Sequence, residues 1–172
     1  MGNQTFCPCV KNFSEGDFPL ARTINPGFLV PIELVILAIM DTYKQKLSHL
    51  KALYHLACSD NELSQVEATY IFNVAERLGV DPEELVDFDG SEPDLDLPDR
   101  QYKLYAVFHR LVMVIMIDNV ANEVEKKYCF DLGIKMGLHP NAIMEVINYV
   151  GQHGPLNAIP GEILSIFRKY LS

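Results

Sequence analysis

Tryptophan is absent from this sequence, and basic residues and cysteines are scarce. The 172 residues include 14 Lys and Arg against 23 Asp and Glu, which gives a formal net charge of −9. Proteins that bind nucleic acids or anionic lipid surfaces through phosphate groups need clustered Lys and Arg. The shortage of basic residues therefore argues against DNA, RNA and anionic membranes as partners.

The four cysteines are too few and too scattered for a disulfide framework. Cys7 and Cys9 form a C-x-C pair, but no second pair or nearby histidine completes a zinc site, so we interpret the pair as incidental. Cys58 and Cys129 fall in apolar helical stretches and lack an obvious activating base. We predict that these two are buried thiols and that neither is catalytic.

No apolar run of the sequence is long enough to cross a membrane, which takes ~20 residues in a helix. Residues 28–40 are apolar but contain Pro31 and Glu33, and residues 111–117 form a still shorter run. The first residues also lack the basic segment, apolar stretch and small-residue cleavage site of a secretory signal. We therefore expect a cytoplasmic protein without a membrane span.

The chain divides near residue 40. Residues 1–39 mix Gly, Pro, Asn, Cys and Phe without a period, which predicts a loosely ordered N-terminal extension. An alternative is that Met40 is the natural start and that the preceding residues do not belong to the native protein. Residues 40–172 show helical patterns, and a hydrophobic content of 49% for the whole chain is enough for a domain with a core.

Amphipathic helices are predicted wherever apolar residues recur at spacings of three and four. Thr42 and Gln45 form a capping box that predicts a helix start. The helix predicted over residues 104–115 is apolar on nearly all sides, which predicts a central position in the fold. Residues 87–99, rich in Asp, Glu, Gly and Pro, predict an exposed acidic connector. The helical patterns cover residues 47–58, 66–78 and 104–115, and we interpret Met113, Met116, Met136 and Met144 as core filler.

Two stretches of the sequence superimpose at a shift of 58 positions without a gap. Ser64 and Glu67 form a helix-capping box, and Asn122 and Glu125 form an equivalent box one repeat later. We therefore predict an all-α fold, a compact helical bundle built from two pseudo-symmetric helix-turn-helix repeats. The matched pairs include Asp60 and Asp118, Asn61 and Asn119, Glu67 and Glu125, Tyr70 and Tyr128, Gly79 and Gly137, and Pro82 and Pro140.

The segment SDNELSQVE at residues 59–67, followed by RLGVDP at residues 77–82, resembles the TerB-like tellurite-resistance family. That family also includes the N-terminal domain of the co-chaperone DjlA. The resemblance extends over residues 43–150 and is weaker in the second repeat, where Val120 stands in place of an equivalent of Glu62. It implies a TerB-like helical domain over residues 40–172, with repeated acids that have been proposed to chelate a metal, often in stress-response systems.

Four repeated acids are the candidate metal ligands: Asp60, Glu67, Asp118 and Glu125. Asp60 and Asp118 follow predicted helix ends, where the helix dipole disfavours a negative charge, so turn amides, solvent or a cation must compensate them. Glu67 and Glu125 already have a structural role in capping boxes. Two interpretations stay open, a site for a hard divalent cation such as calcium or magnesium, or solvated turns plus helix caps.

The leading functional hypothesis is a non-enzymatic TerB-like interaction module, because no nucleophile and base stand at a recognisable catalytic spacing. His49, His55 and His109 likewise lack the spacing of a zinc site. The alternative hypothesis is a divalent-cation-binding or sensing protein that uses the acidic turns. The protein partner is not identified by the sequence, but apolar residues in 28–40 and 160–171 favour a homodimer.

Overall fold

The structure, a computed structural model, describes residues 42–81, 83–86, 91–118 and 121–171. These residues form helices and connecting turns without any strand, so the predicted all-α class is confirmed. None of the helices within those ranges combines the length and apolarity that a bilayer span requires. The extension predicted for residues 1–39 lies outside the described part of the chain.

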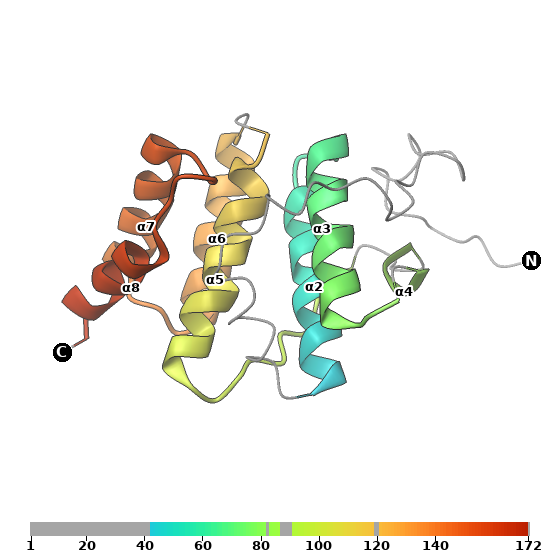
Figure 1. Cartoon of the computed structure of the whole chain (residues 1–172), viewed down its shortest axis with the longest axis horizontal. Coiled ribbons are helices and arrows are strands. Elements are labelled where there is room, and N and C mark those ends of the chain that lie inside the picture. Colours follow the sequence, from blue (N-terminus) through green and yellow to red (C-terminus); the bar gives the residue numbers. More distant parts are fainter. Residues whose placement is uncertain (1–41, 82, 87–90, 119–120, 172) are drawn as a thin grey trace, which may run out of the picture.

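The helices stack side by side with α5 in the middle (Figure 1). α5 packs against α2, α3, α6, α7 and α8, which confirms the central position predicted from its apolar sequence. In Figure 1, α2 and α3 lie to one side of α5 and α6, and α7 and α8 to the other. The helices are α2 (Tyr43–Ala57), α3 (Gln65–Leu78), α4 (Glu83–Val86), α5 (Gln101–Met116), α6 (Glu123–Lys135), α7 (Pro140–His153) and α8 (Pro160–Lys169).

Local signals set the helix ends. The hydroxyl of Thr42 accepts a hydrogen bond from the Gln45 amide at 3.1 Å, so α2 starts where the capping pattern predicted. Gly79 and Gly137 follow α3 and α6 with φ angles of 68° and 76°. Glycine adopts this left-handed conformation without a steric penalty, which explains why these helices stop there.

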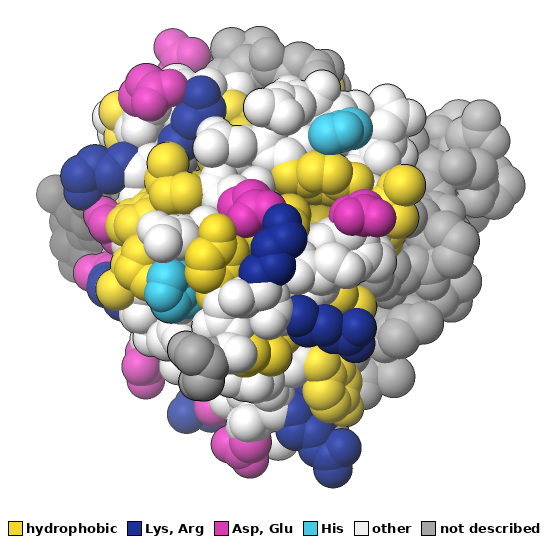
Figure 2. Space-filling view, turned by 90° about the vertical axis from the view of Figure 1, so that its left-hand side faces the viewer, with side chains coloured by type: hydrophobic (Ala, Val, Ile, Leu, Met, Phe, Trp, Pro, Cys, Tyr) yellow, Lys and Arg dark blue, Asp and Glu magenta, His cyan; other side chains and the backbone are white. Residues whose placement is uncertain are grey.

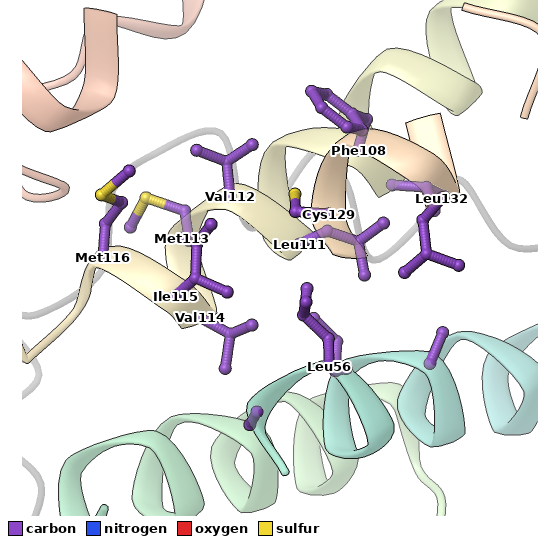
Figure 3. Close-up of a cluster of buried hydrophobic side chains, with 14 of the residues drawn as sticks. Leu56, Phe108, Leu111, Val112, Met113, Val114, Ile115, Met116, Cys129 and Leu132 are labelled. Atoms are coloured by element: carbon purple, nitrogen blue, oxygen red, sulfur yellow. The ribbon is translucent and has the colours of Figure 1, made fainter. Parts of the chain in front are cut away.

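The core lies around α5 (Figure 3). Phe108, Leu111 and Ile115 are at most 1% exposed and pack between helices on both sides. The close approach of α6 to this core depends on Gly133, because a Cβ atom at that position would lie 2.7 Å from Cδ1 of Ile143 and 2.8 Å from Cε2 of Phe108. A larger residue at position 133 would push these elements apart.

Helix bounds recur at the predicted shift of 58 positions. α2 and α5 begin at Tyr43 and Gln101, and α3 and α6 begin at Gln65 and Glu123. The correspondence weakens afterwards, since α4 spans 4 residues whereas α7 spans 14. The equivalent bounds support a duplication, which stays a prediction.

The connector differs from the expectation of a fully exposed acidic loop. Of the predicted residues 87–99, those from 91 onwards are described, and Leu95 and Leu97 pack against the core while Pro98 is buried. Alternating leucines in an acidic stretch give the segment one apolar side, and burial of that side offsets the loss of chain entropy. The connector is therefore partly built into the domain.

Candidate functional site: an acidic seam between the two halves

The four acids singled out in the sequence lie close together where the α2–α3 and α5–α6 pairs meet. We call this group, Asp60, Glu67, Asp118 and Glu125, the acidic seam. The carboxyl groups of Glu67 and Glu125 form a hydrogen bond with each other, and the charges of Asp118 and Asp60 act on Glu67 and Glu125 respectively. Each half of the chain thus supplies one aspartate and one glutamate.

Both glutamates are held by the capping boxes at the start of their helices. A carboxylate oxygen of Glu67 accepts a hydrogen bond from the Ser64 amide at 2.8 Å, and one of Glu125 accepts from the Asn122 amide at 3.1 Å. In return, the side-chain oxygens of Ser64 and Asn122 accept from the amides of Glu67 and Glu125. Both predicted capping boxes are confirmed, and they fix the positions of the Glu67 and Glu125 carboxyl groups within the seam.

Asp60 joins the halves through a second contact. One carboxylate oxygen accepts from the Glu62 amide at 2.9 Å, and the other accepts from the side-chain amide of Asn122. Asn61, between Asp60 and Glu62, has a left-handed backbone conformation with a φ angle of 68°, which Asn tolerates better than most residues. A turn amide and a side-chain amide thus compensate the charge of Asp60.

Burial dominates the protonation of the glutamate pair. Glu67 and Glu125 are 3% and 4% exposed, and this burial raises the pKa of both carboxyl groups. For Glu125, the nearby charges of Glu67 and Asp60 add to the effect and raise its pKa to about 7, against the opposing hydrogen bond from the Asn122 backbone. Two buried carboxylates in contact repel each other, which favours the state in which the pair shares one proton.

The seam is not preformed as a chelating site. Across the described residues, no three His, Cys, Asp or Glu side chains are arranged so that they could hold a metal ion. The shared proton offsets the repulsion that a divalent cation would otherwise relieve. The predicted cation site therefore stays a prediction, although its four residues are brought together.

The two cysteines of the domain are buried, as predicted. Cys58 and Cys129 are 8% and 0% exposed. Burial, and then the charge of Glu125, raise the pKa of the Cys129 thiol far above its ordinary range. This thiol stays protonated at physiological pH and is a poor nucleophile.

Sequence reasoning missed a groove between α6 and α7. It has a volume of about 730 Å³ and is open to solvent. Its lining includes Met116 from α5, Lys126, Lys127 and Phe130 from α6, and Met144 and Ile147 from α7. The prediction that Met144 fills the core is wrong, because this side chain is 48% exposed on the groove wall. A methionine on the outer side of an amphipathic helix was the signal available in the sequence.

The α7–α8 side of the molecule is also rich in exposed apolar groups. Figure 2 shows hydrophobic side chains on this face in patches separated by Lys, Glu or Asp, and His. Exposed large apolar residues here include Met144, Leu156 and Ile159, the last at 58%. A contiguous exposed apolar patch of several hundred Å² usually marks an interaction surface, whereas apolar residues separated by charged groups are ordinary on a protein surface.

Residues 33–89 match the family model described as Tellurite resistance protein TerB. The chain therefore carries a TerB-like segment. The match contains Asp60 and Glu67, whereas Asp118 and Glu125 lie beyond its end. It also begins within the stretch predicted as an extension, before Met40. No curated protein and no solved structure gives a significant match to the chain. The TerB-like segment thus supplies one half of the acidic seam.

Proposed function

We propose that the chain is a non-enzymatic TerB-like module that binds an amphipathic helix of a partner protein in the groove between α6 and α7. The observation that carries the proposal is the groove itself, whose apolar lining includes the half-exposed Met144. Grooves between helices commonly accept the apolar face of a further helix. Methionine walls suit this task because the side chain adapts its shape to the ligand.

The groove also suggests which charges the partner carries. Lys126 and Lys127 lie on its α6 side and pair with Glu123 at 2.9 Å and with Asp131 at 2.7 Å. Exposed ion pairs of this kind stabilise a protein by less than about 1 kcal/mol, so the lysines can exchange partners at little cost. A helix with acidic residues beside its apolar face therefore fits this groove best.

Other observations support a binding role in a stress response. The buried, protonated Cys129 thiol is unsuited to nucleophilic catalysis, and Glu67 and Glu125 have structural work as helix caps. The matched family is described by tellurite resistance, which is a response to a toxic agent.

A differential capture experiment tests this proposal. The purified chain and its Met144→Asp and Ile134→Asp variants are immobilised and exposed to lysate, and a captured protein is then purified and titrated by calorimetry. Ile134 is 42% exposed on α6 but does not line the groove, so its variant is the matched control. We expect Met144→Asp to weaken binding at least tenfold and Ile134→Asp to leave it unchanged. Equal binding by both variants would contradict the proposal, as would a dimer of this chain that forms through Met144 in sedimentation equilibrium.

A second candidate function is divalent-cation binding at the acidic seam, favoured by the contact between Glu67 and Glu125 and by the charges of Asp118 and Asp60 that act on this pair. A cation such as calcium or magnesium would replace the shared proton, so binding should be tightest above pH 7. Calorimetry with Ca²⁺, Mg²⁺ and Mn²⁺ at pH 8 decides the matter. The Asp60→Asn plus Asp118→Asn variant should lose binding, whereas Glu123→Gln plus Asp131→Asn, with the same change of charge outside the seam, should retain it. Equal affinities of these two variants would exclude the seam as the site.

A further inference from the structure

Polar contacts fasten the connector to α2 and α6. We call residues 91–98 the strap. The Ser48 hydroxyl donates to the Asp94 carbonyl at 2.8 Å and accepts from the Asp96 amide at 2.8 Å. Lys44 on α2 pairs with the Asp96 carboxylate at 3.5 Å, and an ion pair between Lys135 and Glu92 ties the strap to α6. The strap is therefore attached at both ends by groups of different helices.

A histidine lies under the strap without any hydrogen bond that the described residues could supply. His49 is 3% exposed, and neither of its ring nitrogens has a partner within the described ranges. The ring lines a small cavity of about 10 Å³, which is closed by Leu95, Leu97 and Pro98 of the strap and by Val107 and Leu111 of α5. A buried imidazole in such apolar surroundings tolerates the neutral form far better than the charged form.

The charged groups around His49 reinforce this preference. Burial first, and then the positive charge of Arg110 on α5, lower the pKa of His49 well below 6.5. Asp96 also lines the cavity and is the one acidic residue among the described residues of its lining, but it pairs with Lys44. Met136, which follows the last residue of α6, contributes an uncharged side chain. Within the described part of the chain, a proton on the ring therefore has no dedicated counterion in the closed arrangement.

We infer that the strap is an acid-released cover, closed over α2 and α5 while His49 is neutral and opened when the ring takes up a proton. Opening moves Leu95, Leu97 and Pro98 away from the ring and lets water reach both nitrogens. It also uncovers the apolar side chains of α2 and α5 that line the cavity. The helices themselves need not move, because the strap contributes no helical hydrogen bonds.

The pH range of the switch follows from linkage. In the open state the ring is in water and has its ordinary pKa of about 6.5, whereas in the closed state the pKa is well below this value. The closed state is favoured above pH 6.5, and this advantage is lost as the pH falls. The opening constant should rise about tenfold for each pH unit below 6.5, until the pKa of the closed state is reached.

Hydrogen exchange of the Asp96 amide, followed by NMR between pH 7.5 and 5 and corrected for the intrinsic rate, tests the inference. In the wild type, protection of this amide should fall about tenfold per pH unit below 6.5, while amides of α7 stay protected. His49→Leu should remove this slope and keep the strap closed. His153→Gln is the matched control, because it removes an exposed histidine on α7 and should leave the slope unchanged.

A second variant separates the strength with which the strap is attached to α2 from the pH dependence of its opening. Ser48→Ala removes both hydrogen bonds to the strap, so it should lower the protection of the Asp96 amide at every pH without changing the slope. Three results would overturn the inference: a slope retained in His49→Leu, an Asp96 amide that is unprotected even at pH 7.5 in the wild type, or strap and α7 amides that lose protection together.

Discussion

The carboxyl groups of Glu67 and Glu125 are hydrogen-bonded to each other between the starts of α3 and α6. Each glutamate also completes the capping box of its own helix, so one side chain serves its helix and the contact between the halves. A shared proton makes this contact attractive, and its loss leaves two negative charges in a buried place. The stability of the domain is therefore linked to pH through this pair.

The stabilisation contributed by the Glu67–Glu125 pair should fall as the pH rises from about 4.5 to about 7. The pKa of Glu125 is raised to about 7 in the folded chain, so the folded state holds a proton that the unfolded chain has released. The contribution of the pair to the free energy of unfolding is complete below the pKa of the unfolded chain. It is lost as the pH rises through the pKa of the folded chain. Urea unfolding of wild type and Glu125→Gln at several pH values measures it, because the glutamine keeps a donor for Glu67 at every pH.

The matched control for that experiment is Glu123→Gln on the same helix. Its side chain is 90% exposed and pairs with Lys126, so its pH dependence should follow the wild type. If the difference in free energy of unfolding between the wild type and Glu125→Gln does not change with pH, the glutamate pair shares no proton.

The two helix caps should differ in their contribution to stability. Ser64→Ala removes one capping bond and should cost about 1 kcal/mol. Asn122→Ala removes an equivalent cap and also the side-chain bond to Asp60 in the other half, so it should cost about 2 kcal/mol or more. Denaturant unfolding of both variants gives the comparison. A smaller loss in Asn122→Ala than in Ser64→Ala would show that the Asp60 contact stabilises nothing.

Gly133→Ala should destabilise the domain by about 1–3 kcal/mol, because the new Cβ would overlap Ile143 and Phe108. Gly161→Ala is its counterpart within α8, where a Cβ would have open space around it. That change should be neutral or stabilising by up to about 1 kcal/mol, since alanine favours helix. Thermal unfolding of both variants checks the prediction, and equal melting temperatures would argue against the close contact of α6 and α7.

Features set by neighbouring residues could be predicted from the sequence. The capping boxes of Ser64 and Asn122 and the left-handed glycines at 79 and 137 depend on a few adjacent residues, and the structure has them as expected. The convergence of Asp60, Glu67, Asp118 and Glu125 was foreseen only as a condition, that the two turns meet. The spacing of the repeat is compatible with such a meeting, but only packing determines the distance between the turns.

Other features depend on contacts between segments that are distant in the sequence, so the sequence holds only weak signals of them. The exposure of Met144 depends on how α6 and α7 pack, and its one signal in the sequence is the place of Met144 on the outer side of an amphipathic helix. The burial of Leu95 and Leu97 depends on Ser48, far away in the sequence, which fastens the strap. The protonation of Glu125 depends on a partner in the other half of the chain.

The most direct test of the central relationship is an NMR titration of the side-chain carboxyl carbons of Glu67 and Glu125. We predict a coupled titration of the two signals, with one step near pH 7 that disappears from the Glu67 signal in Glu125→Gln. Two independent titrations near pH 4.5, unaffected by the substitution, would show that the carboxyl groups do not meet and would contradict the account.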